Sequence, residues 1–497
     1  PVFELLSVVP KNEICKNPVL NKRLSELERK YGGKYVLEEP YQSRMTGVEA
    51  PYPEKAYEKM NFNQLIESFK KYDESTGWGK PRENHLKGGL VEHSRSFADQ
   101  VSKRPDHFYK FIFEIGDRDD ISKIYLESAI GGLVLAKYSS DKIKKLVLRY
   151  WKIDEDGFRL NIIRAIEYIN TTDNLDLSLI NVLAEYAIND SDPQIERWKE
   201  LNSNGEIGDP LTEGVNHVRG SAVFALMRHA YKTKYPSKLF DILEKVSDDN
   251  AISVKCCLIA SLQVMFRYNR KRTVKLFNKL TETLHPQIIR YGIECLYYLL
   301  KSNNFKTYIP HLKIASQITE RRGNTDIANY TGQVLMYAYG NEYPGSFNVL
   351  SECFNKIVDI RAGVLKYSIA NLCSNNIKLS KKSKNIFLKL LSDTSSEIVH
   401  TYSLGFANQI SVDKFNELYP IISEYSKSTV LNHDSYYYLE YLLKCVNYEP
   451  EKCLNLIENY YKLQRPDITL NSITGKEPLE ILAGAYNRLT NEKYREK

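Results

Sequence analysis

The sequence of 497 residues lacks the short motifs that mark the common enzyme classes. Gly77-Trp78-Gly79-Lys80 and Gly475-Lys476 place a lysine after glycine, but neither has the Gly-x4-Gly-Lys-Ser/Thr run that cradles a nucleotide phosphate. The Gly-x-Ser-x-Gly elbow of serine hydrolases is also absent. We therefore expect no catalytic residues in this chain and no ATP hydrolysis by it.

Long apolar runs are missing as well. No run approaches the ~20 apolar residues that a membrane-spanning helix needs, so we expect no membrane partner. The sequence opens at Pro1 without the charged and apolar stretch of a secretory leader. We interpret the chain as a piece of a longer cytoplasmic protein.

Cysteine is scarce and widely spaced. Its eight positions are Cys15, Cys256, Cys257, Cys295, Cys353, Cys373, Cys445 and Cys453. Most lie in apolar stretches, and neither the adjacent pair nor the last two match the Cys-x2-Cys spacing of zinc sites. The pattern favours reduced thiols in the core of a cytoplasmic protein over a disulfide framework.

Histidine offers one stretch that resembles a metal-site motif. Gly88-Gly89-Leu90-Val91-Glu92-His93 is similar to part of some HD-type metal phosphohydrolases, which also need a His-Asp pair shortly downstream. The only such pair here is His433-Asp434, 340 residues after His93. We expect a helix start, with no metal and no cofactor. An HD-type enzyme is an alternative that metal analysis of the purified protein would test.

The charge balance is mildly basic, at +7 from 69 basic and 62 acidic residues. Four basic clusters stand out: Lys142–Arg149, Arg267–Lys275, Arg321-Arg322 and Lys378–Lys384. Such runs are typical of solvated helix faces, although a row of them could bind nucleic acid. We place Arg270 near the end of a first helix and Lys381 in an inter-helix connection. These are not equivalent positions, which argues against a single basic groove.

A periodic pattern organises the second half of the chain. A branched apolar residue followed by a basic or similar residue recurs at Val218-Arg219, Val254-Lys255, Ile289-Arg290, Ile360-Arg361 and Val399-His400. The gaps are 36, 35, 71 and 39 residues, and the long gap is two units with a degraded copy near Ile327-Ala328. A helical repeat of this length predicts an all-α solenoid of HEAT-like hairpins, a right-handed superhelix of roughly ten units.

This period suggests five segments along the chain. They are an irregular N-terminal segment (1–60), N-terminal helical hairpins (61–189), an inserted loop (190–214), HEAT-like repeats (215–430) and C-terminal capping helices (431–497). The inserted loop is longer than most loops of compact domains, which makes it either a tolerated insertion or a binding element. We expect deletion of Asp192 to Asp209 to spare folding and weaken partner capture.

Two groups of residues are singled out for roles in stacking and binding. In the HEAT class an aspartate or proline near a turn and an arginine in the following helix hold neighbouring hairpins together. Arg219, Arg290, Arg361 and Asp249 fit that structural role. Tyrosine and arginine tend to dominate affinity at protein interfaces. The binding candidates are therefore Arg197, Trp198, Arg270, Arg272, Tyr436 and Tyr437.

The order of motifs between Tyr52 and Leu262 resembles a known family. The motifs are Glu58-Lys59-Met60, Lys70-Lys71-Tyr72-Asp73, Lys87-Gly88-Gly89, Arg104-Pro105-Asp106-His107-Phe108, Ala129-Ile130-Gly131-Gly132-Leu133, Asp209-Pro210 and Val215-Asn216-His217-Val218-Arg219-Gly220-Ser221-Ala222. They are similar to the C-terminal helical-repeat region of large bacterial antiviral NTPases of the STAND superfamily. These motifs are structural ones.

The resemblance implies that this chain is the sensor arm of such a protein. In that family the repeats recognise an invading phage protein, the NTPase module then oligomerises, and a separate effector acts. Neither of those activities carries over, because neither module is visible in this sequence. We expect a protein-recognition module whose self-association would require another module. The alternatives are a nucleic-acid-binding α-solenoid and a general protein–protein scaffold.

Overall fold

The protein is helical throughout the part of the chain that the structure describes. This computed structural model describes residues 14, 16–30, 48–77, 80, 87–172, 174–200, 208–322, 325–463 and 477–489. Within them the chain forms α-helices and short 3-10 turns and no β-strand, apart from one isolated bridge between Glu49 and Lys87. The prediction of an all-α protein is confirmed. None of the described helices is long and apolar enough to cross a bilayer.

The chain divides into two compact units. The first comprises residues 1–100 and 118–125, and the second comprises residues 101–117 and 126–497. Among its described residues, the first unit contains the helices α3 (Pro18–Lys30), α4 (Glu54–Lys59) and α5 (Phe62–Lys71) and most of α6 (Leu90–Lys103). The segment 1–60, predicted to be irregular, thus contains the helices α3 and α4.

An aromatic core explains why residues before position 60 fold with those after it. Tyr57 of α4, Phe69 of α5 and Phe97 of α6 are all buried, and the rings of Phe69 and Phe97 lie 4.8 Å apart. Helix α5 begins with a capping box, in which the Asn61 side chain accepts from the Gln64 N–H at 2.9 Å. The Gln64 side chain accepts in return from the Asn61 N–H at 3.0 Å. These contacts fix the start of the helix.

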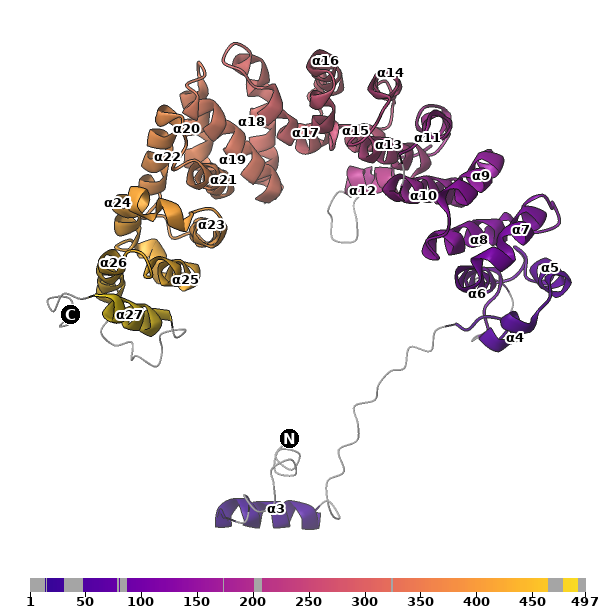
Figure 1. The fold of residues 1–497 in the computed structure, drawn as a ribbon, viewed down its shortest axis with the longest axis horizontal. Coiled ribbons are helices and arrows are strands. Elements are labelled where there is room, and N and C mark those ends of the chain that lie inside the picture. Colours follow the sequence, from indigo (N-terminus) through magenta and orange to yellow (C-terminus); the bar gives the residue numbers. More distant parts are fainter. Residues whose placement is uncertain are drawn as a thin grey trace. The chain divides into compact units, whose positions relative to one another are not determined.

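The second unit contains the remaining helices (Figure 1). In chain order they are α7 (Pro105–Gly116), α8 (Lys123–Leu135, which begins in the first unit), α9 (Ser140–Tyr150), α10 (Asp156–Thr172), α11 (Leu177–Asn189), η1 (Arg197–Lys199), α12 (Pro210–Val215), α13 (Val218–His229), α14 (Pro236–Val246), α15 (Ile252–Ile259), η2 (Leu262–Arg267), α16 (Arg270–Thr281), α17 (Pro286–Leu299), α18 (Phe305–Arg322), α19 (Thr325–Gly340), α20 (Ser346–Lys356), α21 (Val358–Ala370), α22 (Ile377–Lys389), α23 (Ser396–Asn408), η3 (Val412–Lys414), α24 (Phe415–Tyr425), η4 (Thr429–Asn432), α25 (Tyr436–Cys445), α26 (Pro450–Leu463) and α27 (Glu477–Arg488).

From α13 onward the helices of the second unit form two rows (Figure 1). The odd-numbered helices make the first row, in which each packs on the next odd-numbered helix as far as α27. The even-numbered helices make the second row, with contacts from α18 to α20 and from α22 through α24 to α26. Each pair is a hairpin whose apolar side is buried by its neighbours.

The periodic residues of the sequence occupy one packing position of the first row. Val218, Val254, Ile289, Ile360 and Val399 lie in the first turns of α13, α15, α17, α21 and α23, and all are buried. Ile327, the degraded copy, is buried at the corresponding place in α19. A branched side chain therefore fills the same contact between consecutive first-row helices.

Helices α19 and α21 approach each other most closely through two glycines. A Cβ atom on Gly332 would lie 2.4 Å from the carbonyl oxygen of Ile360, and one on Gly363 would lie 2.5 Å from that of Asn329. Neither distance leaves room for a methyl group, so only glycine allows this backbone contact. The crossing fixes the spacing of the two helices that carry much of the candidate site.

Several predictions concern cysteines and chain ends. The seven cysteines in the described part of the chain are free, and all of them except Cys373 are buried. Burial raises the pKa of the Cys257 thiol to about 12, which keeps it protonated and unreactive. Cys15 lies outside the described residues, as do residues 464–476 and 490–497 of the predicted C-terminal capping segment.

Candidate functional site

The predicted inserted loop is structured at both ends. It contains the 3-10 turn η1 and most of the helix α12, while residues 201–207 lie outside the described part. Trp198 is only 7% exposed, and its indole N–H donates to Glu196 Oε1 at 3.0 Å. Glu196 also accepts from the backbone N–H of Ser253 in α15 at 2.7 Å. Trp198, predicted to bind a partner, is therefore buried and holds the segment on the first row through Glu196.

Further anchors lie at both ends of this segment. The Asp192 carboxylate is 2.6 Å from Nδ1 of His217 and accepts from the Val218 N–H at 2.7 Å, so it caps α13. Asp209 accepts from the hydroxyl of Tyr291 in α17. Deletion of residues 192–209 would remove these anchors, so we now expect it to destabilise the first row as well as to affect partner capture. Arg197 is exposed and is the one predicted contact residue of the segment that faces solvent.

Substitution of Trp198 tests this anchoring role. Trp198→Ala is expected to cost about 3–5 kcal/mol of the free energy that holds the segment in place, because a large buried ring is lost. Limited proteolysis should then show faster cleavage between Asp190 and Gly208. Arg197→Ala is the control, and as an exposed substitution it should change stability by less than about 0.5 kcal/mol. Equal cleavage of the two variants would contradict the anchoring role.

Arg219 and Asp249 form a half-buried link between hairpins. Arg219 Nε lies 2.8 Å from Asp249 Oδ2, and its Nη1 donates to the Asp190 carbonyl at 2.9 Å. Asp249 Oδ1 also accepts from the Ala251 N–H at 2.7 Å, just before α15. The carboxylate therefore caps one first-row helix while it binds the arginine of the preceding one.

The same arrangement recurs at one predicted position and is absent at another. Arg361 Nε of α21 lies 2.9 Å from Asp393 Oδ2, and Asp393 Oδ1 accepts from the Ser395 N–H before α23. Arg290 of α17 makes no ion pair with the described residues, although its charge helps to lower the pKa of Asp209. Of the three arginines predicted to hold neighbouring hairpins together, Arg219 and Arg361 therefore do so through an aspartate.

Several residues of the basic clusters pair with acidic residues of neighbouring hairpins. Arg272, a predicted binding residue, lies 2.8 Å from Asp241 and 2.9 Å from Glu244 of α14. Lys378 and Lys382 of α22 both pair with Glu342. Because these pairs occupy the cations, the clusters supply less positive charge than the sequence indicates.

The predicted positions of Arg270 and Lys381 are wrong. Arg270 is the first residue of the second-row helix α16, and Lys381 lies within the second-row helix α22. The argument that they occupy unlike elements therefore fails. Arg270 is exposed, and its Nη2 donates to the Tyr298 carbonyl at 2.6 Å.

The tyrosines predicted at the C-terminal cap differ in exposure. Tyr436 at the start of α25 is 49% exposed, and its hydroxyl donates to Glu440 at 2.9 Å. Tyr437 is half-buried, and its ring lies 5.1 Å from that of Tyr436. Tyr438 and Tyr441 of the same helix are buried in the core. The pair is therefore accessible from solvent at the start of α25.

His93 has the surroundings of a core residue. Its ring is buried and contacts five aromatic rings edge-on: those of Tyr52, Tyr57, Phe69, Tyr72 and Tyr125. Burial lowers the pKa of His93 to about 4, so the imidazole is neutral at pH 7. Within the described residues, no three His, Cys, Asp or Glu side chains gather closely enough to hold a metal ion.

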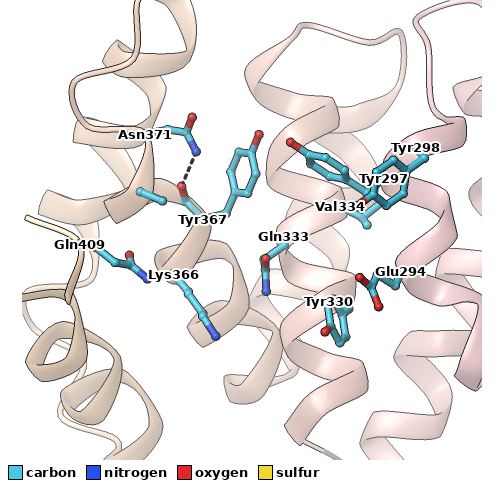
Figure 2. A pocket seen from close by; sticks show the side chains of 11 residues that line it. Glu294, Tyr297, Tyr298, Tyr330, Gln333, Val334, Lys366, Tyr367, Asn371 and Gln409 are labelled. Carbon is cyan, nitrogen blue, oxygen red and sulfur yellow. Dashed lines mark hydrogen bonds between the residues drawn. The ribbon is translucent and has the colours of Figure 1, made fainter. Parts of the chain in front are cut away.

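A pocket lined by tyrosines lies across three first-row helices (Figure 2). Its volume is about 400 Å³. One wall comes from α17 and the start of α19, with Glu294, Tyr297, Tyr298 and Tyr330, while Lys366 and Tyr367 of α21 form the facing wall (Figure 2). Tyr297, Tyr298 and Tyr330 are each about 40% exposed, at 40%, 42% and 39%.

The tyrosine rings of this pocket support one another. The Tyr297 ring lies 4.9 Å from that of Tyr337 and 6.3 Å from that of Tyr367, and Tyr298 stacks on Phe266 at 5.8 Å. Aromatic pairs at such distances stabilise each other by about 0.5–1.5 kcal/mol. The rings are therefore held in place before any ligand arrives, which reduces the entropy cost of binding.

A second pocket of about 440 Å³ adjoins the first and shares Lys366 and Gln409 with it. It extends along α19, α21 and α23. We call the combined surface the tyrosine groove, and its main residues are Glu294, Tyr297, Tyr298, Tyr330, Asp359, Lys366, Tyr367, Glu397, His400 and Gln409. The groove runs over four consecutive first-row helices.

The groove has an excess of negative charge. It contains three carboxylates against one lysine, Lys366. Burial raises the pKa of Glu294, and burial followed by the nearby charge of Glu397 raises the pKa of Asp359. Burial and then the charge of Glu294 raise the pKa of Tyr298 and Tyr330. These carboxylates lie in a partly dry, negative environment.

Sequence reasoning did not identify the groove residues. The sequence carries one signal for the two tyrosines of the groove walls. Tyr297 and Tyr367 lie 70 residues apart, which is twice the predicted period of about 35. Counting tyrosines at the end of each first helix would have placed both on one surface. The carboxylates carried no such signal, since Glu294, Asp359 and Glu397 follow no common spacing.

Comparison with known proteins adds no relative. No model of a known protein family matches the sequence, and no curated protein is significantly similar to it.

Proposed function

We propose that this chain is a protein-recognition module built as a right-handed α-solenoid of HEAT-like hairpins. It serves as the sensor region of a larger cytoplasmic antiphage NTPase of the STAND superfamily and binds a phage protein. The two rows of helices and the recurring buried position of Val218, Val254 and Ile289 support the repeat architecture. The family assignment rests on the motif order between Tyr52 and Leu262.

The tyrosine groove is the observation that carries the binding role. Three half-exposed tyrosines lie around a pocket of about 400 Å³ on the face of the first row. Tyrosine is enriched at the energetic centres of protein interfaces, because its ring buries a large area with few rotatable bonds. A soluble protein has little other reason to hold several ordered tyrosine rings at its surface.

Nucleic acid binding and a general scaffold role are the alternatives. The pairing of Arg272, Lys378 and Lys382 with carboxylates leaves the basic clusters with less charge for phosphate. A nucleic-acid-binding module would show affinity that falls steeply with salt. Self-association is assigned to a module of the intact protein other than this chain.

The proposal is tested by screening purified phage proteins, one at a time, for binding to the purified chain. We expect at least one to bind with a Kd of roughly 1 μM or tighter. The Tyr297→Ala, Tyr298→Ala double variant should weaken that binding by about 30-fold, because hot-spot aromatics contribute about 2 kcal/mol or more.

Tyr231→Ala is the matched control, since Tyr231 is an exposed tyrosine outside the groove. It should leave the Kd within about twofold. Binding of no phage protein, together with salt-sensitive binding of DNA, would contradict the proposal and favour the nucleic acid alternative.

A further inference from the structure

The three carboxylates of the tyrosine groove have no cation of their own. Among the described residues, the side chains of Glu294, Asp359 and Glu397 form no ion pair and accept no hydrogen bond, although each is half-buried. Lys366 lies in the same groove but is exposed and pairs with none of them. Half-buried carboxylates lose part of their hydration without the compensation of a partner.

Several carboxylates elsewhere on the same unit pair with arginine or lysine. Asp241 and Glu244 share Arg272, and Glu342 holds both Lys378 and Lys382. Asp249 and Asp393 hold Arg219 and Arg361. In contrast to these paired carboxylates, Glu294, Asp359 and Glu397 of the groove line a cavity without a cation partner among the described residues.

The tyrosines complete a site for a cation with an apolar stem. Tyr298 and Tyr330 lie close enough to Glu294 for its charge to raise the pKa of both. Figure 2 shows Glu294 and Tyr330 on the same wall of the pocket. The face of a tyrosine ring attracts a guanidinium or ammonium group, and arginine stacks on such rings most often. A flexible basic side chain can therefore meet a ring and a carboxylate in the same pocket.

We propose that the tyrosine groove binds a basic segment of the partner protein, with an arginine or lysine inserted between Tyr298 and Tyr330 toward Glu294 and a second cation near Asp359 and Glu397. This inference rests on the proposed function and names the chemistry of the partner. Lys366 lies between the two carboxylate regions and is free to turn toward solvent, because it is exposed. The groove thus selects against acidic segments.

A peptide-display selection on the full chain tests the inference. A random dodecapeptide library is selected on the wild-type protein and depleted on the Glu294→Gln, Asp359→Asn double variant. We expect selected peptides to be enriched in arginine and lysine. The best synthetic peptide should bind the wild type about 10-fold more tightly than the double variant, and added salt should weaken it.

The control is the Glu282→Gln, Glu451→Gln double variant. It has the same change of net charge, and both glutamates are exposed outside the groove. It should bind the peptide within about twofold of the wild type. The two double variants remove no ion pair recorded in the structure, so both should keep the wild-type unfolding midpoint.

Two results would overturn the inference. One is selection of apolar or acidic peptides without enrichment of basic residues, and the other is equal binding of basic peptides to the wild type and the groove variant. Failure of the proposed function has a different signature. In that case basic peptides bind the groove, but no phage protein binds the chain. A phage protein that binds equally to the Tyr297→Ala, Tyr298→Ala variant would instead leave the sensor role intact and overturn the groove inference.

Discussion

Lowering the pH from 7 to 5 is expected to destabilise the protein by about 2 kcal/mol for each of three buried histidines. Burial lowers the pKa of His93, His229 and His311 to about 4 in each case. A histidine whose folded-state pKa lies below its ordinary value of 6.5 binds its proton more weakly in the folded state. Stability is therefore lost as pH falls below 6.5, and the loss grows until pH is about 4.

The hydrogen bonds of these rings explain why a second proton is not tolerated. His229 Nδ1 lies 3.0 Å from Asn170 Oδ1, and His311 Nε2 lies 3.0 Å from Thr281 Oγ1. The other nitrogen of each ring is buried and has no hydrogen-bond partner among the described residues, as is true of His93 Nδ1. Protonation would place an unpaired N–H and a positive charge in an apolar site.

Urea denaturation at pH 7 and pH 5 measures the effect. The His229→Gln variant cannot take up this proton, so the drop in its unfolding free energy between the two pH values should be about 2 kcal/mol smaller than that of the wild type. His433→Gln, at an exposed histidine, should keep the wild-type pH dependence. An identical pH dependence for His229→Gln and the wild type would show that His229 is not held neutral.

Loss of Arg219 is expected to destabilise the protein more than loss of Arg290 or Arg361, the two arginines at related positions. Arg219→Ala would leave the Asp249 carboxylate, which is 9% exposed, without its cation. It would also leave the carbonyls of Asp190 and Pro193 without the donors at 2.9 and 3.2 Å. Breaking such a buried pair by removing one partner costs about 3–5 kcal/mol. Urea denaturation should show a lower midpoint.

Two arginines at related positions serve as graded controls. Arg361→Ala breaks a pair whose side chains are each 21% exposed, so water can partly solvate Asp393, and its cost should be smaller, about 1–3 kcal/mol. Arg290→Ala removes no ion pair with a described residue and should cost less than about 1 kcal/mol. Equal losses for Arg219→Ala and Arg290→Ala would show that the link between hairpins is not what stabilises the stack.

The helical architecture could be predicted because it depends on local pattern. Val218, Val254 and Ile289 recur at nearly equal spacing since each fills the same contact between consecutive first-row helices. The sequence also carries strong signals for helix starts, namely Asn61 before α5 and Pro236 in the first turn of α14. Each of these signals can be recognised without knowing which side chains pack together.

Apart from the link of Arg219 with Asp249, the particular side-chain contacts between hairpins could not be predicted. Trp198 reads as an exposed aromatic in a polar segment, yet Glu196 and the backbone of Ser253 hold it against the first row. The sequence predicts positively charged clusters at Arg272 and Lys378. In the structure, acidic residues of the preceding hairpin pair with these two cations. These pairings are not evident from the sequence, because Asp241 lies 31 residues before Arg272 and Glu342 lies 36 residues before Lys378.

The tyrosine groove could not be predicted for the same reason. Its walls come from α17 and α21, and their relation depends on how closely α19 packs on α21 at Gly332 and Gly363. No spacing rule gives that approach in advance. A glycine in an apolar helix usually has no packing role that requires it. The close backbone contacts in the structure identify Gly332 and Gly363 as required.

Hydrogen exchange of the chain with and without a bound partner tests most directly whether recognition occurs in the tyrosine groove. Backbone amides of α17, α19 and α21 should be the ones protected on binding, together with the turn after α23 that carries Gln409. Protection confined to α25 and the pair Tyr436 and Tyr437, or to residues 190–200, with α17 through α21 unchanged, would contradict the account.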